Sequence, residues 1–168
     1  MPSLADVFRV LNRMRDEEIV AQYAIGGATA VLFHAEPTRT YVLDVFVTLQ
    51  ATGEDVLAPL SRVYEWARGQ GFVVQAEHLL IAGVPVQLLP AYNALVEAAL
   101  ATARRHDYAG VPVRVVDPEH LVALALQAGG ARRRERAWQL LEAGAVERGR
   151  LRQVLTTHAI AAKIPDDA

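Results

Sequence analysis

Two adjacent glycines, Gly26 and Gly27, follow a short apolar run near the start of the chain and constrain its fold more than any other feature. The run, residues 19–25, is rich in β-branched residues, and helix-forming residues return at Ala28. Glycine adopts backbone conformations that other residues avoid, and it lets two chain segments approach closely. The pattern therefore predicts a strand, a tight glycine turn and a helix that begins at the turn.

The absence of cysteine narrows the chemistry available to the chain. It excludes disulfide scaffolds, thiolate zinc sites, iron–sulfur clusters and cysteine nucleophiles. Hydrophobic residues make up 52% of the 168 residues, which is enough for one large core and argues against a disordered chain. The formal net charge of −2 gives no overall signal for binding to nucleic acid or to a membrane surface.

Two stretches without charged residues, 19–35 and 78–96, are candidates for a membrane span. Both are interrupted by glycine, proline or polar residues, whereas a spanning helix needs about 20 predominantly apolar residues. The N-terminal sequence also lacks the basic region and apolar run of a secretory signal. We therefore expect a cytoplasmic protein that has no membrane partner.

Helix and strand signals alternate irregularly along the chain. Helices are predicted over residues 3–16, 28–33, 56–67, 92–105, 118–128, 131–143 and 147–160. Strands are predicted over 19–25, 39–49 and 111–116, together with a strand pair in 72–89 that turns at Ala82 and Gly83. This order differs from regular βαβ alternation, so it predicts an α+β fold: a mixed sheet with helices on one side and a helical C-terminal subdomain. The boundaries we predict are an α/β core over 1–116, C-terminal helices over 117–163 and a flexible tail over 164–168.

The segment YAIGGATAVLFHAEPTRTYVLDVFV, residues 23–47, resembles the nucleotidyltransferase superfamily, whose fold is that of polymerase β. Within it, the segment resembles the small bacterial proteins related to abortive-infection and toxin–antitoxin nucleotidyltransferases. Those proteins have a strand ending in Gly-Gly or Gly-Ser, a short helix, a Thr-x-Asp-(apolar)-Asp strand and a third acid on a later strand. Gly26, Gly27, Thr40 and Asp44 fall on that pattern. The later segment VRVVDPEHLVALALQAGGARRRERAWQLL resembles the family's tail, so the likeness spans roughly residues 18–145.

The resemblance implies transfer of a nucleoside monophosphate from an NTP to a hydroxyl of RNA or protein. Gly26, Gly27 and Thr40 are then nucleotide-binding, and Asp44 is the catalytic residue and a ligand of Mg²⁺. A glycine turn that leads into a helix N-terminus lets backbone amides approach a triphosphate. Two carboxylates two residues apart on a strand point to one face, where they can hold a pair of divalent ions.

The chain departs from this pattern at the positions of the metal ligands. Val42 stands at the position of the first carboxylate and Gln87 at that of the third, so only Asp44 remains. Ala125 stands where the family usually has a lysine. The sequence therefore indicates a degenerate active site, unless another acid such as Glu36 or Glu77 substitutes for a missing ligand. The alternative is a non-catalytic, antitoxin-like or regulatory scaffold.

Asp44 lies within an apolar strand, where an unpaired carboxylate is costly to bury, so it must face solvent, an arginine or a metal. If Ala82 and Gly83 form a two-residue turn, His78 lies opposite Gln87. Asp44, His78 and Gln87 could then cluster in a cleft that also includes Val42. The alternative is that His78 is an exposed strand residue.

Four arginines form the most concentrated positive region: Arg132, Arg133, Arg134 and Arg136. Three more follow on the next predicted helix at positions 148, 150 and 152. Such a cluster can contact nucleotide phosphates, RNA or an acidic partner protein. Alternatively, it is a solvated helix face whose charge is relieved by neighbouring glutamates. The sequence gives no signal for the oligomeric state.

Overall fold

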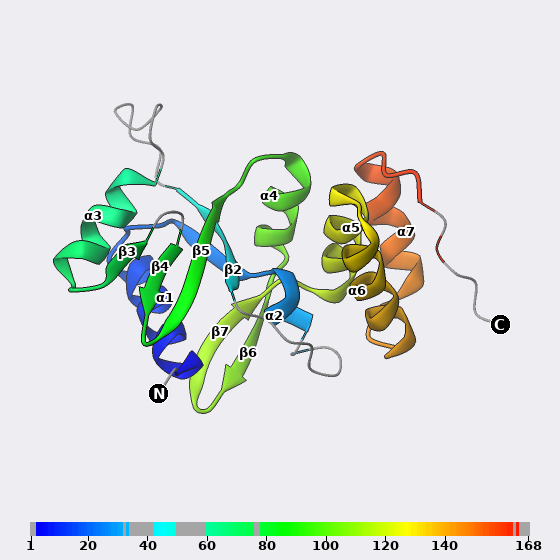
Figure 1. The fold of residues 1–168 in the computed structure, drawn as a ribbon. Coiled ribbons are helices and arrows are strands. Elements are labelled where there is room, and N and C mark those ends of the chain that lie inside the picture. Colours follow the sequence, from blue (N-terminus) through cyan, green and yellow to red (C-terminus); the bar gives the residue numbers. More distant parts are fainter. Residues whose placement is uncertain are drawn as a thin grey trace.

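Figure 1 shows the computed structural model of the chain, in which residues 3–31, 33, 42–49, 60–75, 78–162 and 164 are described. The strands are β1 (Gln22–Ile25), β2 (Leu43–Thr48), β3 (Val73–Gln75), β4 (His78–Ile81), β5 (Val84–Pro90), β6 (Arg104–Tyr108) and β7 (Val111–Val115). The helices are α1 (Leu4–Asp16), α2 (Gly27–Val31), α3 (Ser61–Gly69), α4 (Ala94–Ala101), α5 (Pro118–Ala128), α6 (Ala131–Glu142) and α7 (Arg148–Thr157). The predicted α+β class with a mixed sheet is confirmed.

The described strands form one sheet in the order β3-β4-β5-β2-β1-β7-β6. Strand β2 lies at its centre, antiparallel to β1 and parallel to β5. The register pairs Asp44 of β2 with Gln87 of β5. Because residues paired across neighbouring strands point to the same face, Asp44 and Gln87 share one face of the sheet.

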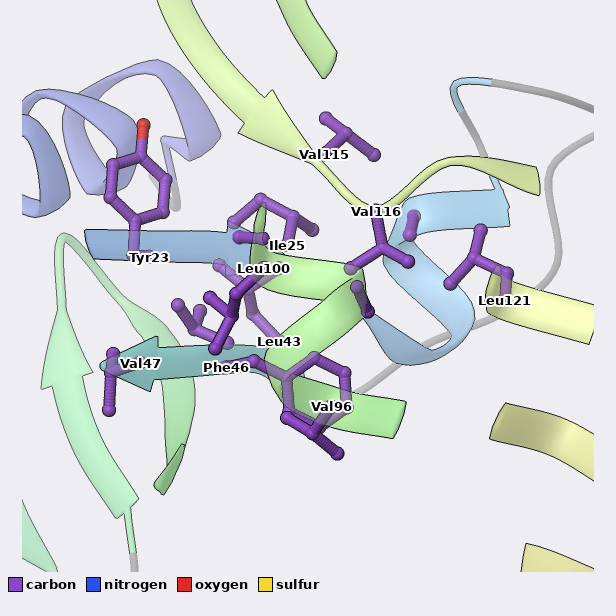
Figure 2. Close-up of a cluster of buried hydrophobic side chains, with 14 of the residues drawn as sticks. Tyr23, Ile25, Leu43, Phe46, Val47, Val96, Leu100, Val115, Val116 and Leu121 are labelled. Carbon is purple, nitrogen blue, oxygen red and sulfur yellow. The ribbon is translucent and has the colours of Figure 1, made fainter. Parts of the chain in front are cut away.

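Helices cover both faces of the sheet, not the single face that the order of elements predicted. Tyr23 of β1 points toward α1, where its hydroxyl donates to Asn12 Oδ1 at 2.6 Å. Tyr23 pairs with Val47 of β2, so the neighbouring Phe46 points to the opposite face. Helix α4 contacts β1 and β2, and Figure 2 shows its Val96 within the buried cluster that includes Phe46.

Two stretches fold differently from the sequence prediction. Residues 104–105, predicted as the end of a helix, instead begin strand β6, which pairs with β7 along its whole length. Ala109 and Gly110 join the two strands with φ angles of 50° and 82°, as a two-residue hairpin turn requires. The predicted strand pair in residues 72–89 is three strands, β3, β4 and β5. Its turn at Ala82 and Gly83 is where the sequence placed it.

Helices α6 and α7 both pack against α5, and α5 in turn contacts α2 and α4. Figure 1 shows the three C-terminal helices as a group beside the sheet. Helix α5 begins at Asp117, whose side chain accepts a hydrogen bond from the backbone N–H of His120 at 2.9 Å, as expected of an N-cap. Among the described helices, none is long and apolar enough to cross a membrane.

Candidate functional site

The two glycines after β1 are required by the side chains that pack against them. Gly27 has a φ of 58°, and a β-carbon there would overlap the Asp44 carboxylate, lying 3.1 Å from its Cγ. A β-carbon on Gly26 would overlap the Phe46 ring, with Cδ2 at 2.8 Å. The backbone N–H of Gly26 also donates to the Asp44 carbonyl at 2.9 Å. The Asp44 side chain therefore packs directly against the backbone of Gly27 in the turn that the sequence predicted.

Helix α2, which the turn leads into, has only five residues. A helix of little more than one turn sums few peptide dipoles, so its N-terminus attracts an anion only weakly. Thr40, the third residue predicted to bind nucleotide, lies outside the described residues, as do Glu36 and Glu77. The attraction for a phosphate near Gly27 must therefore come chiefly from other groups.

Gly27 and Asp44 line a cleft of about 550 Å³ between the sheet and the α5–α6 pair. Arg132, Arg133 and Arg136 of α6 line the same cleft. Positions three and four apart lie on one side of a helix, which explains why these arginines face the cleft together. Arg134 points elsewhere and lines a separate depression with Trp138. The structure thus brings three of the four predicted arginines to the predicted catalytic carboxylate.

The remaining lining of the cleft is apolar or small. Aromatic and aliphatic side chains come from the sheet, from the segment after β5 and from α5, namely Phe46, Leu89, Tyr92, Leu121 and Leu124. The side chain of Tyr92 is 63% exposed, and its ring centroid lies 6.5 Å from that of Phe46. The linker Gly129–Gly130 and four alanines of α5 and α6 also line the cleft. The cleft has one apolar side and one cationic side.

Burial raises the pKa of the half-buried Asp44 carboxyl above its ordinary value. Arg136, Arg133 and His78 lower it, in decreasing order, but burial has the larger effect. None of the salt bridges among the described residues involves Asp44. The arginines therefore act on this carboxylate across the cleft and not as direct ion-pair partners.

Replacing Asp44 by asparagine is expected to stabilise the ligand-free protein at neutral pH. The pKa of Asp44 is higher in the folded state than in the unfolded chain, so the unfolded chain ionises first as pH rises. The wild type therefore loses stability between the unfolded-state pKa and the folded-state pKa. Asparagine cannot ionise. The stability of Asp44→Asn relative to the wild type should therefore increase from about pH 4 up to the raised pKa and stay constant above it. Thermal melts from pH 4 to 8 measure it.

The matched control for this measurement is Asp107→Asn on the exposed strand β6. This exchange removes the same charge and is expected to change stability by no more than about 0.5 kcal/mol. An Asp44→Asn protein that is less stable than the wild type at pH 7 would show that the carboxylate is not destabilising in the free protein.

The other predicted cleft residues lie beside the cleft and do not line it. Gln87 is the register partner of Asp44. The β4–β5 hairpin pairs Leu79 with Val86, and the next step of that register places His78 across from Gln87. The structure therefore puts Asp44, Gln87 and His78 in a row on three adjacent strands. Val42 precedes β2 and does not fill the cleft.

These side chains do not fit a pair of divalent ions. Among the described residues, there is no group of three or more histidine, aspartate and glutamate side chains that could hold a metal ion. Asp44 contributes one carboxylate, Gln87 offers only a neutral amide oxygen, and valine at position 42 has no donor atom. The arginines on α6 further disfavour a cation beside Asp44.

A second polar cluster, at the start of α5, had not been predicted from the sequence. Asp117 is fully buried, and its Oδ2 accepts from the Arg150 guanidinium at 2.9 Å while its Oδ1 lies 2.8 Å from His120 Nδ1. Arg150 also lies 3.6 Å from Glu119. The His120 and Arg150 interactions lower the pKa of Asp117 to about 2 despite its burial. Arg150 therefore joins α7 to α5 and does not belong to a free positive surface.

No family model and no curated protein matches this sequence. Solved structures do match over nearly the whole chain, and the following two are among them. The solution structure of the antibiotic-resistance factor ANT(2'')-Ia shares 13% identity, with 92% of this chain and 90% of that chain covered and a TM-score of 0.52. The crystal structure of an antigenic nucleotidyltransferase-like protein from Paracoccidioides brasiliensis shares 15% identity, with 94% and 89% covered and a TM-score of 0.56.

The chain has a nucleotidyltransferase fold. The family resemblance read from residues 23–47 is thereby confirmed at the level of the fold. The narrower likeness to abortive-infection and toxin–antitoxin proteins stays a prediction. Within the nucleotidyltransferase fold, Asp44 and the glycine turn occupy the β2 edge of the cleft, and the arginines of α6 face them.

Proposed function

We propose that this chain is a nucleotide-binding protein of the nucleotidyltransferase fold, with an NTP held in the cleft and the transfer chemistry largely lost. One observation carries the proposal. Asp44, Gly27 and the arginines Arg132, Arg133 and Arg136 line a single cleft, although they come from opposite ends of the sequence. The fold provides the cleft, and the arginines provide the charge that an anionic ligand needs.

The two sides of the cleft favour a ligand that combines an anionic part with a flat apolar part. Arginine guanidinium groups match phosphate geometry and form charge-assisted hydrogen bonds with it. The exposed ring of Tyr92, next to Phe46, offers a surface on which a base can stack. A volume of about 550 Å³ is within the range of small-molecule sites. A nucleotide has both parts, whereas inorganic phosphate has only one.

The donor set around Asp44 supports the proposed loss of transfer chemistry. Transfer of a nucleoside monophosphate to an RNA or protein hydroxyl depends on ions that neutralise the moving phosphoryl group. One carboxylate beside Gln87 and Val42 is a poor ligand set for Mg²⁺. Asp44 is the only one of the three expected acids present.

The scaffold alternative needs the arginines on an outer surface, free to meet RNA or an acidic protein. Three of the four predicted arginines line the cleft instead, and only Arg134 points away from it. Arg150 on the neighbouring helix is engaged with buried Asp117. The three cleft arginines share their cleft with Asp44 and apolar side chains, and this arrangement favours a ligand in the cleft over a partner on the helix face.

Binding of each of the four NTPs by isothermal titration calorimetry tests the proposal. We expect binding to at least one NTP, and we expect Arg133→Ala combined with Arg136→Ala to weaken it about 100-fold, or about tenfold for each charged contact. Arg134→Ala is the control, because it removes an exposed arginine of the same helix outside the cleft. Its affinity should stay within about twofold of the wild type.

Two results would contradict the proposal. Absence of binding to all four NTPs, with and without Mg²⁺, would leave the cleft without a nucleotide role. Equal losses in the Arg134→Ala control and in the double variant would point instead to a diffuse charge effect of the whole helix.

A further inference from the structure

We propose that the cleft binds the phosphate groups of its nucleotide directly through arginine, with Arg133 and Arg136 in the place that divalent cations would occupy. This inference rests on the proposed function and specifies the form of the ligand: a nucleotide polyphosphate free of metal. It contradicts the Mg²⁺ dependence that the family resemblance implies for an active enzyme.

The first support is the charge of the cleft. Among the residues that the structure describes, the charged side chains lining it are three arginines and one carboxylate. A site that binds metal-bridged phosphates has the opposite composition, because carboxylates hold the ions and the ions hold the phosphates. Here the positive charge is already part of the protein, so a divalent ion would meet repulsion from the arginines.

The second support is the state of Arg136. Its side chain is half-buried, and burial lowers its pKa while nearby Asp44 raises it. Among the described residues, no partner forms a hydrogen bond or a salt bridge with this guanidinium. A phosphate oxygen that accepts hydrogen bonds from such a partly desolvated guanidinium is bound strongly, because the N–H donors have no other partner to give up.

The third support is the position of Arg133, one helical turn before Ala137 on the side that faces the cleft. The only hydrogen bond from its side chain to a described residue is a long one, 3.5 Å, to the Gly129 carbonyl. The side chain is exposed and can turn toward a ligand without breaking a strong contact. Arg133 and Arg136 both lower the pKa of Asp44, so both lie within electrostatic reach of the same point in the cleft.

Asp44 has opposite roles in the two modes of binding, and this separates them experimentally. In a metal-bridged site the carboxylate holds the ion, so its removal abolishes binding. In an arginine site the carboxylate repels the phosphates and competes for the same arginines, so its removal strengthens binding. Asp44→Asn keeps the side-chain shape next to Gly27 while it removes the charge.

The experiment is calorimetric titration with ATP, GTP, CTP, UTP and inorganic tripolyphosphate, first in EDTA and then in excess Mg²⁺. Four proteins are compared: the wild type, Asp44→Asn, Arg133→Ala combined with Arg136→Ala, and the control Arg134→Ala. Circular dichroism and a thermal melt establish that each variant is folded. Tripolyphosphate separates the contribution of the phosphates from that of the base.

We expect the wild type to bind a nucleotide in EDTA, and excess Mg²⁺ to weaken binding because the ion occupies phosphate oxygens and cancels their charge. We expect Asp44→Asn to bind at least as tightly as the wild type, and the double arginine variant to lose about 100-fold in EDTA. The affinity should also fall as salt concentration rises.

Binding that needs Mg²⁺ and is lost in Asp44→Asn would overturn this inference and leave the nucleotide-binding proposal standing. No binding of any nucleotide in either buffer would overturn both. If the double arginine variant binds in EDTA as tightly as the wild type, only the role of Arg133 and Arg136 is overturned, since the ligand must then be held by other residues.

Discussion

Replacing Asp117 by alanine is expected to lower the free energy of unfolding by about 3–5 kcal/mol, because it removes one partner of a buried ion pair. Asp117 has no exposed surface, and its two oxygens contact His120 and Arg150 at 2.8–2.9 Å. The variant leaves the Arg150 guanidinium without its shortest ion pair and α5 without its N-cap. Glu119, at 3.6 Å from Arg150, is too distant to compensate fully.

Urea denaturation and thermal melts measure this loss. For a chain of this size, each kcal/mol corresponds to about 2–4 °C in the melting temperature, so we expect a fall of roughly 6–20 °C. Asp117→Asn retains the N-cap and loses only the charge, so its stability should lie between that of Asp117→Ala and that of the wild type. The exposed Asp107→Ala should change stability by about 0.5 kcal/mol or less. A loss below about 1 kcal/mol in Asp117→Ala would mean that the cluster contributes little.

The same cluster predicts a pH signature. Asp117 has its pKa lowered from 3.8 to about 2, so its stabilisation is complete above pH 4 and disappears as the pH falls toward 2. The Asp117→Ala protein has no such group. Its stability should therefore fall less steeply than that of the wild type between pH 4 and 2.

Replacing Gly27 by alanine is expected to be the most damaging single change in the cleft. Two costs add at this position. The φ of 58° is unfavourable by about 1–2 kcal/mol for a residue with a β-carbon. The added carbon also overlaps the Asp44 carboxylate, so either the turn or the side chain must move. We expect a stability loss of about 2–4 kcal/mol in total and a nucleotide affinity reduced by at least about tenfold.

Gly71 is a matched control, because it has a φ of 87° and open space around the position of a β-carbon. Gly71→Ala should therefore cost only the backbone strain, about 1–2 kcal/mol, and leave nucleotide affinity unchanged. The difference between the two variants isolates the contact with Asp44. Combining Gly27→Ala with Asp44→Gly should recover part of the loss in stability. Equal losses at Gly27 and Gly71 would show that the close approach of Asp44 has no energetic consequence.

The sequence by itself determined the features that depend on local chemistry. Ser3 and Asp117 each cap a helix with a side-chain oxygen that accepts from a backbone N–H three residues later, and such caps are readable from residue type and spacing. The glycine turn after β1 follows from the same kind of signal, as does the two-residue turn at Ala82 and Gly83. Residues 23–47 also carried enough of a family pattern to indicate the fold.

Tertiary structure alone decided the features that depend on distant partners. The polar run RRHDY became strand β6 because the Ala109–Gly110 turn returns the chain onto β7, and pairing outweighs the weak intrinsic preference of those residues. From the sequence, Asp44 and the arginine cluster were separate features: Asp44 indicated a metal ligand, and the arginines indicated contacts with phosphate, RNA or an acidic partner. Packing of α5 against α2 and α4, and of α6 against α2, brought them to one cleft. Contacts between distant segments depend on which apolar faces bury one another, and the local sequence does not specify this.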